Sequence, residues 1–164
     1  MVTILRADEF ESFCSAIGFI EVTWAFLEAQ LDRWAQLFFI RLDGKKIERL
    51  MPHGFAKKSA FLRKCFNKLP ILSPYKDRGL EILDQADIIS IKRNDYTHAV
   101  VESLKSVNGN FSMINRKLRK DGTHSIKSVQ FEVRKFPDLS LKLVRLGRDA
   151  VRLSADFVSD LSSP

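Results

Sequence analysis

The stretch FESFCSAIGFIEVTWAFLEAQLDRWAQLFF, residues 10–39, decides the fold of this chain. Its large apolar side chains recur at alternating steps of three and four, which is the spacing of one face of an α-helix. The positions on this stripe are Phe10, Phe13, Ile17, Ile20, Trp24, Leu27, Leu31, Trp34 and Phe38. The pattern predicts a helix of roughly 30 residues, from about Asp8 to Phe39, with both tryptophans in the core. An isolated coiled coil is the alternative, but other helices are available to cover the stripe.

Three further segments carry helical patterns. Residues 57–69 place apolar side chains on one side and basic side chains round the rest. Residues 78–104 carry apolar side chains round the whole circumference, as expected for a helix buried on several sides. A closing helix begins at Phe136-Pro137-Asp138, where proline and aspartate suit the first turn, and is expected to run parallel or antiparallel to the first. Between the first two helices, residues 41–55 predict a loop because glycine and proline interrupt them.

The periodicity changes before the closing helix. Residues 111–119 and 125–133 flank Lys120-Asp121-Gly122-Thr123, and apolar and polar side chains alternate in the second run. Asp-Gly between two such runs predicts a β-hairpin with a tight turn and positive φ at both central residues. The fold class that follows is mainly α: a four-to-five-helix bundle with a β-hairpin inserted before the C-terminal helix, in one domain over residues 1–164.

Charge is distributed unevenly along the 164 residues, whose formal net charge is +7. Residues 41–135 hold 21 basic and 10 acidic side chains, whereas residues 1–40 hold two basic and six acidic ones. A basic face attracts polyanions such as RNA, although a moderate net charge also keeps many proteins soluble. The composition therefore permits a nucleic-acid partner without requiring one.

Several classes of site and location are not indicated. The N-terminus lacks a basic region followed by an apolar one, and no apolar run approaches the ~20 residues of a membrane helix. We therefore expect a cytoplasmic protein without membrane contact. Cys14, Cys65 and the three histidines lack metal-ligand spacing, so we expect no metal and read both cysteines as small buried apolar residues. We expect no cofactor, and the absence of a glycine-rich phosphate loop argues against kinase and nucleoside-triphosphatase chemistry.

One short run combines a guanidinium, an amide and an imidazole: Arg93-Asn94-Asp95-Tyr96-Thr97-His98. On a helix, Asn94 and His98 are four positions apart and share a face, and Arg93 is one position from Asn94. An arginine that clamps phosphate oxygens and a histidine that titrates near neutral pH suffice for metal-free cleavage of an RNA phosphodiester. In the alternative reading, Arg93 pairs with a carboxylate, Asn94 caps a turn and His98 completes a core.

The run Arg93 to His98, with the apolar lead-in Ile88-Ile89-Ser90-Ile91-Lys92, resembles the motif of the HEPN superfamily, an arginine and a polar residue followed after a short spacer by a histidine. The predicted bundle and hairpin are similar to that family as well. The resemblance implies a metal-independent endoribonuclease, often a toxin of a toxin–antitoxin or antiviral defence system, that acts as a homodimer with both motifs facing one cleft. Val100 departs from the toxin pattern, in which a modified tyrosine often follows the histidine by two residues.

The resemblance also implies roles for single residues. Arg93 would hold the phosphate, Asn94 would orient it, and His98 would take the 2′-hydroxyl proton or protonate the leaving 5′-oxygen, producing a 2′,3′-cyclic phosphate and a 5′-hydroxyl. The residues that we assign to RNA binding are Lys92, Arg116, Lys117 and Arg119. Possible partners are RNA, a second copy of the chain and an antitoxin protein. Two alternatives stay open: a non-catalytic module that binds nucleotide, RNA or a protein, and a structural protein in which the motif stitches the bundle.

Overall fold

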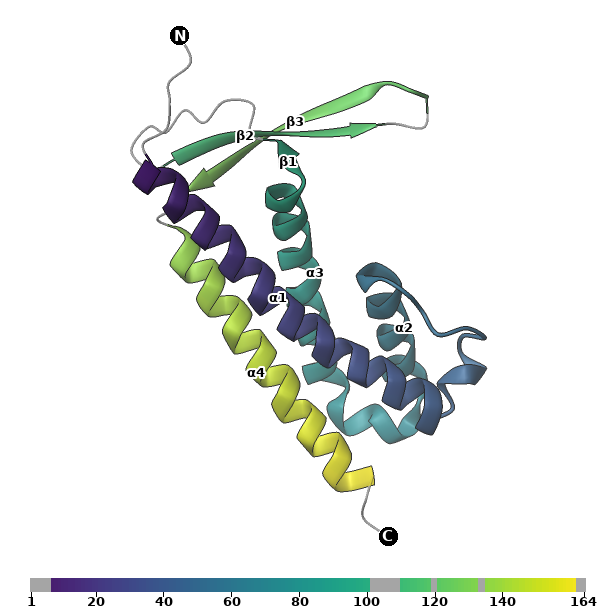
Figure 1. The fold of residues 1–164 in the computed structure, drawn as a ribbon. Helices are drawn as coiled ribbons and strands as arrows, with labels where there is room; N and C mark the ends of the chain where they lie inside the picture. Colours follow the sequence, from purple (N-terminus) through teal and green to yellow (C-terminus); the bar gives the residue numbers. More distant parts are fainter. Residues whose placement is uncertain (1–6, 101–109, 119–120, 133–134, 162–164) are drawn as a thin grey trace. The chain divides into compact units, whose positions relative to one another are not determined.

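The chain folds mainly into helices, with a small sheet before the last one (Figure 1). The computed structural model describes residues 7–100, 110–118, 121–132 and 135–161. The α-helices in these ranges are α1 (Ala7–Arg41), α2 (Phe55–Lys68), α3 (Lys76–Thr97) and α4 (Phe136–Leu161). The strands are β1 (Ala99–Val100), β2 (Asn110–Leu118) and β3 (His124–Glu132). The predicted fold class, mainly α with a hairpin before the C-terminal helix, is therefore confirmed.

The chain forms two compact units. Met1–Val22 and Ser90–Leu141 make one, which we call the hairpin unit, and Thr23–Ile89 and Lys142–Pro164 make the other, the aromatic unit. Helices α1, α3 and α4 each contribute residues to both units, so the division does not follow chain order. That residues 1–164 are a single domain stays a prediction.

Aromatic side chains fill the core of the aromatic unit. The Phe157 ring of α4 lies 5.5 Å from Trp34 and 5.3 Å from Phe38, both on α1, and Phe66 of α2 lies 5.4 Å from Phe38. Trp34 Nε1 donates a hydrogen bond to Ser154 Oγ at 2.6 Å, which satisfies its one polar group. All four rings are at most 2% exposed, which confirms Trp34 as a core residue.

Helices α1 and α4 run in the same direction within the aromatic unit. Trp34 contacts Ser154, and four residues later Phe38 contacts Phe157, so residue numbers rise together along the two helices. Of the two orientations left open by the sequence, the structure has the parallel one.

In the hairpin unit, β2 pairs with β3 and with the short strand β1, both antiparallel. Phe131 on β3 is buried and meets two rings edge to face, Phe13 of α1 at 5.2 Å and Tyr96 of α3 at 4.9 Å. Buried Met113 and Val129 are paired across β2 and β3. The alternation of apolar and polar residues in β3 thus attaches one face of the hairpin to α1 and α3.

The turn of the hairpin is longer than predicted. Leu118 pairs with His124, so residues 119–123 lie between the strands. Gly122 has φ +80°, but Asp121 is not among the residues with positive φ, so the tight turn with two positive φ values is wrong. Instead the Asp121 carboxylate accepts hydrogen bonds from the backbone N–H of Thr123 at 2.9 Å and from its hydroxyl at 2.6 Å. This side-chain turn offers the backbone an alternative to the two-residue loop.

Helix α3 ends seven residues earlier than predicted, at Thr97 instead of Leu104. Ala99 and Val100 pair with Asn115 and Ile114 of β2. Their backbone hydrogen-bonding groups therefore join a sheet, a structure that the β-branched Val100 favours over a helix. The motif thus lies at the end of a helix and not within one.

The outer side of α1 is more apolar than predicted. Cys14, expected in the core, is exposed because it lies off the stripe, whereas Cys65 is buried and burial, with the Glu48 charge, raises its thiol pKa to about 12. Among the described residues, one helical stretch, Phe10–Arg41, is long and apolar enough to cross a membrane by length and composition alone. Only 28% of its most apolar window is buried. The expectation that no apolar run approaches this length was wrong, because small uncharged residues occupy the face opposite the stripe.

Candidate functional site at the end of α3

The three predicted catalytic residues lie together at the C-terminal end of α3. The backbone N–H of His98 donates to the Asn94 carbonyl at 3.1 Å, so His98 closes the last helical hydrogen bond although the helix itself ends at Thr97. The His98 side chain is exposed, and the Arg93 and Asn94 side chains are partly buried. His98 therefore does not complete a core and is accessible to a ligand.

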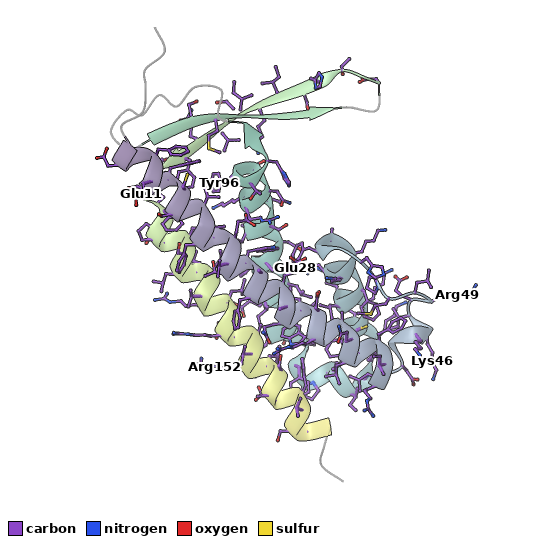
Figure 2. All side chains as sticks on the ribbon, in the orientation of Figure 1. Glu11, Glu28, Lys46, Arg49, Tyr96 and Arg152 are labelled. Atoms are coloured by element: carbon purple, nitrogen blue, oxygen red, sulfur yellow. The ribbon has the colours of Figure 1, made fainter. Side chains whose placement is uncertain are left out.

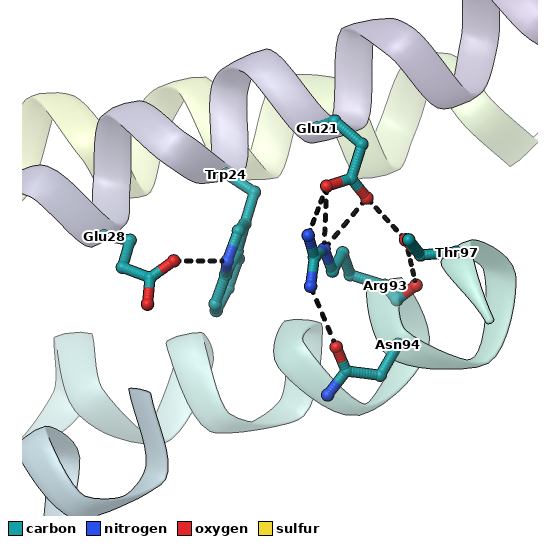
Figure 3. A network of polar contacts seen from close by, with 6 residues as sticks. All are labelled: Glu21, Trp24, Glu28, Arg93, Asn94 and Thr97. Carbon is teal, nitrogen blue, oxygen red and sulfur yellow. Dashed lines mark hydrogen bonds and ion pairs between the residues drawn. The ribbon is translucent and has the colours of Figure 1, made fainter. Parts of the chain in front are cut away.

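Arg93 is held by a carboxylate that the sequence did not reveal. Its Nε donates to both oxygens of Glu21 on α1, at 2.9 and 3.0 Å, and its Nη2 also pairs with Glu21 (Figure 3). Its Nη1 donates to Asn94 Oδ1 at 3.1 Å. The side chains are 24% exposed for Arg93 and 30% for Glu21, so solvent screens the pair only in part. The guanidinium is thus fixed on both sides.

Thr97 adds a further contact to this network. Its hydroxyl lies within hydrogen-bonding distance of the Arg93 carbonyl, at 2.9 Å, and of a Glu21 oxygen. A hydroxyl has one proton, so it donates to one of these acceptors at a time. Burial raises the pKa of Glu21, but hydrogen bonds from Arg93 and Thr97 and the charges of Arg93 and His98 lower it further, and the net pKa is below its ordinary value. Glu21 is therefore a carboxylate at neutral pH.

The remaining motif residues tie α3 to the hairpin. Asp95 pairs with Lys127 of β3, and Tyr96, which Figure 2 labels on α3, contacts Phe131. Burial, followed by the charges of Asp95 and Glu132, raises the pKa of the Tyr96 phenol. Every side chain from Arg93 to Thr97 therefore has a partner within the hairpin unit.

The residues assigned to RNA binding are placed less completely. Lys92 is exposed and lines a hollow of about 240 Å³, together with Tyr96 one turn along α3. Arg116 and Lys117 lie on β2, where their backbones pair with Ile126 and Ser125. Arg119 lies outside the described residues. The structure does not bring these four together into one surface.

Glu21 and Thr97 are the residues of this site that sequence reasoning missed. Glu21 is more than seventy positions from Arg93 in the chain, so spacing alone contains no signal for the pair. The one available signal is that Glu21 is a charged residue in the middle of a long apolar helix, where a partner is needed. Among the described residues no three His, Cys, Asp or Glu side chains come together.

No family model matches this chain, and comparisons with curated proteins and with solved structures find no match either. The fold and the site define the class of protein: a mainly α protein in which a helix-terminal Arg-Asn-His cluster is braced by a carboxylate from the first helix.

Proposed function

We propose that the protein is a metal-independent endoribonuclease of the HEPN type. The observation that carries the proposal is the exposed His98 imidazole beside a guanidinium whose position is fixed by Glu21 and Asn94. Fixed donors at a site of developing charge stabilise a transition state without reorganisation. A toxin or defence role, as in the proteins that the motif resembles, would follow from such an activity.

Arg93 keeps donors for a phosphate in this arrangement. A guanidinium has five N–H donors, and the described contacts use the one on Nε and one on each Nη nitrogen. Two donors are left for phosphate oxygens. Glu21 acts as a positioning residue: it sets the orientation of Arg93 while its own charge stays off the substrate.

Proton transfer requires a second group. Cleavage to a 2′,3′-cyclic phosphate needs a base at the 2′-hydroxyl and an acid at the 5′-oxygen, on opposite sides of the phosphorus. His98 is the one histidine in this cluster, since His53 lies in the loop before α2 and His124 begins β3. A second copy of the chain would supply the second imidazole, so the proposed enzyme is a homodimer.

The second candidate is a non-catalytic module that binds nucleotide, RNA or a protein partner. The specific observation in its favour is that Glu21 already neutralises Arg93 and that the motif side chains up to Thr97 hold the hairpin unit together. In this reading the motif is a structural clasp and only its exposed residues contact a partner.

Incubation of the protein with structured and single-stranded RNA in EDTA separates the two candidates. We expect wild type to cleave and His98→Ala, which removes an exposed side chain, to fold normally and lose cleavage by at least about 10²-fold. Activity should also vary with pH near neutrality, because an unperturbed imidazole titrates near pH 6.5. RNA binding that persists in both proteins without cleavage would favour the non-catalytic module.

Salt provides a further control on binding. Contacts from basic residues to phosphates release counterions, so RNA affinity should fall steeply as salt rises. A salt-independent affinity would exclude Lys92 and the basic strand β2 as an RNA surface.

A further inference from the structure

The exposed side of α1 carries no charge for about five turns. Between Glu11 and Arg33, all fully exposed residues are uncharged, and the charged residues in that interval are only partly exposed. The uncharged residues form what we call the outer α1 face: Ser12, Cys14, Ser15, Gly18, Phe19, Val22, Ala25, Phe26 and Ala29. Val22 is 71% exposed, and the two phenylalanines are 46% and 47% exposed. Such an apolar surface on one helix marks an interaction site.

The outer α1 face is complementary to itself about Val22. In an antiparallel pair of α1 helices with Val22 at the two-fold axis, each residue before Val22 faces the residue equally far after it in the partner. Gly18 then faces Phe26, and Phe19 faces Ala25. A Cβ on Gly18 would meet nothing within 4 Å, so the space that a phenyl ring needs is open. Large residues thus meet small ones on both sides of the axis.

Charge follows the same symmetry. Glu11 and Arg33 are both eleven positions from Val22, so the antiparallel pair brings the carboxylate of one copy beside the guanidinium of the other at each end of the contact. Glu11 lies near the N-terminal end of α1 (Figure 2). Ser15 and Ala29, seven positions from Val22, are both small and allow close approach between the helices. A parallel pair would instead place like charges together.

We propose that the outer α1 face binds the same face of a second copy, as an antiparallel, two-fold symmetric helix pair. An isologous contact of this kind requires a self-complementary surface, which this face provides. A lipid surface fits less well, because residues 1–40 hold six acidic and two basic side chains and biological membranes attract cations.

The symmetry has a consequence for the candidate site, and this step rests on the proposed function. Glu21 precedes Val22 by one residue and lies about a quarter turn from it round the helix. A two-fold axis at Val22 therefore brings the Glu21–Arg93 pairs of both copies to the same side of the dimer, across helices about 8–10 Å apart. Two Arg93 and two His98 side chains would then flank one axis.

Cysteine cross-linking tests the antiparallel register. In a Cys14→Ser background, Val22→Cys places two thiols at the axis, and we expect mild oxidation to give a covalent dimer. Wild type should not cross-link through Cys14, because the two Cys14 residues would lie roughly 24 Å apart along the helices. Cross-linking through both positions would indicate a parallel pair and overturn the proposal. The control is Val158→Cys, on an equally apolar but unrelated exposed position of α4.

Charge exchange tests the same register without cysteines, by light scattering and sedimentation. Glu11→Arg and Arg33→Glu each create two like-charge contacts and should weaken the dimer about tenfold, whereas the double variant restores both pairs and the affinity. A double variant weaker than either single one would overturn the proposal. Val22→Glu, with its helix content checked by circular dichroism, should be a monomer.

A wild-type monomer, or sedimentation with anionic phosphatidylserine vesicles that Val22→Glu abolishes, would assign the face elsewhere and overturn the dimer. Since none of these measurements uses RNA, failure of the dimer is distinguishable from failure of the proposed nuclease. If wild type cleaves RNA and dimerises through α1, Val22→Glu should lose cleavage together with dimerisation.

Discussion

In the aromatic unit, Trp34, Phe38 and Phe157 contact one another edge to face and are at most 1% exposed. In the hairpin unit, the end of α3 is held instead by ion pairs, from Arg93 to Glu21 and from Lys127 to Asp95, that solvent reaches in part. Burial of rings is insensitive to pH and is strengthened or weakened mainly through packing. Ion pairs depend on pH and salt. The comparison teaches that the candidate site stands in the part of the molecule whose stability responds to solution conditions.

The largest expected effect breaks the aromatic unit. Phe157→Ala removes a ring that is 0% exposed and touches Trp34, Phe38 and Tyr75. We expect the free energy of unfolding to fall by about 3–5 kcal/mol, because the lost transfer free energy and the cavity both contribute. Urea denaturation followed by circular dichroism measures this. Phe10→Ala, at a ring that is 48% exposed, is the matched control and should cost less than about 1 kcal/mol.

A smaller effect is expected in the hairpin unit. Arg93→Ala leaves the Glu21 carboxylate partly buried without its main partner and should destabilise by about 1–2 kcal/mol, discounted for its exposure. The double variant Glu21→Ala/Arg93→Ala should cost less than the sum of the two single variants, because removing both partners leaves no unpaired charge. Additive costs would show that the pair contributes nothing and that the two units do not differ in the way proposed.

The smallest effect concerns pH. The pKa of Glu21 is lowered in the folded protein, so its contribution to stability is fully present above its ordinary value of 4.5 and is lost as pH falls below that value through the folded pKa. Hydrogen exchange of the last turn of α3 should therefore speed up on acidification before exchange in the Trp34 segment does. Glu21→Gln should abolish that difference. An unchanged difference in the variant would place the acid sensitivity in another group.

Much of the fold was predictable because local periodicity encodes it. The α1 stripe with Trp24 and Trp34 in the core, the helix beginning at Phe136 and the two hairpin strands are confirmed. The errors fall where two local preferences compete. Helix α3 stopped at Thr97 because β2 was available to pair with Ala99 and Val100, and the hairpin turn lengthened because Asp121 bonds its own backbone.

The sequence by itself determined the elements of this protein and the candidate residues Arg93, Asn94 and His98, because helix spacing places groups four residues apart on one face. Only the tertiary structure decided what surrounds them. The Glu21 carboxylate comes from a helix more than seventy residues away and is met through folding alone, as is the Lys127 partner of Asp95. Exposure was decided there too, since whether an apolar residue such as Val22 is covered depends on which helix faces pack together and not on the residue itself.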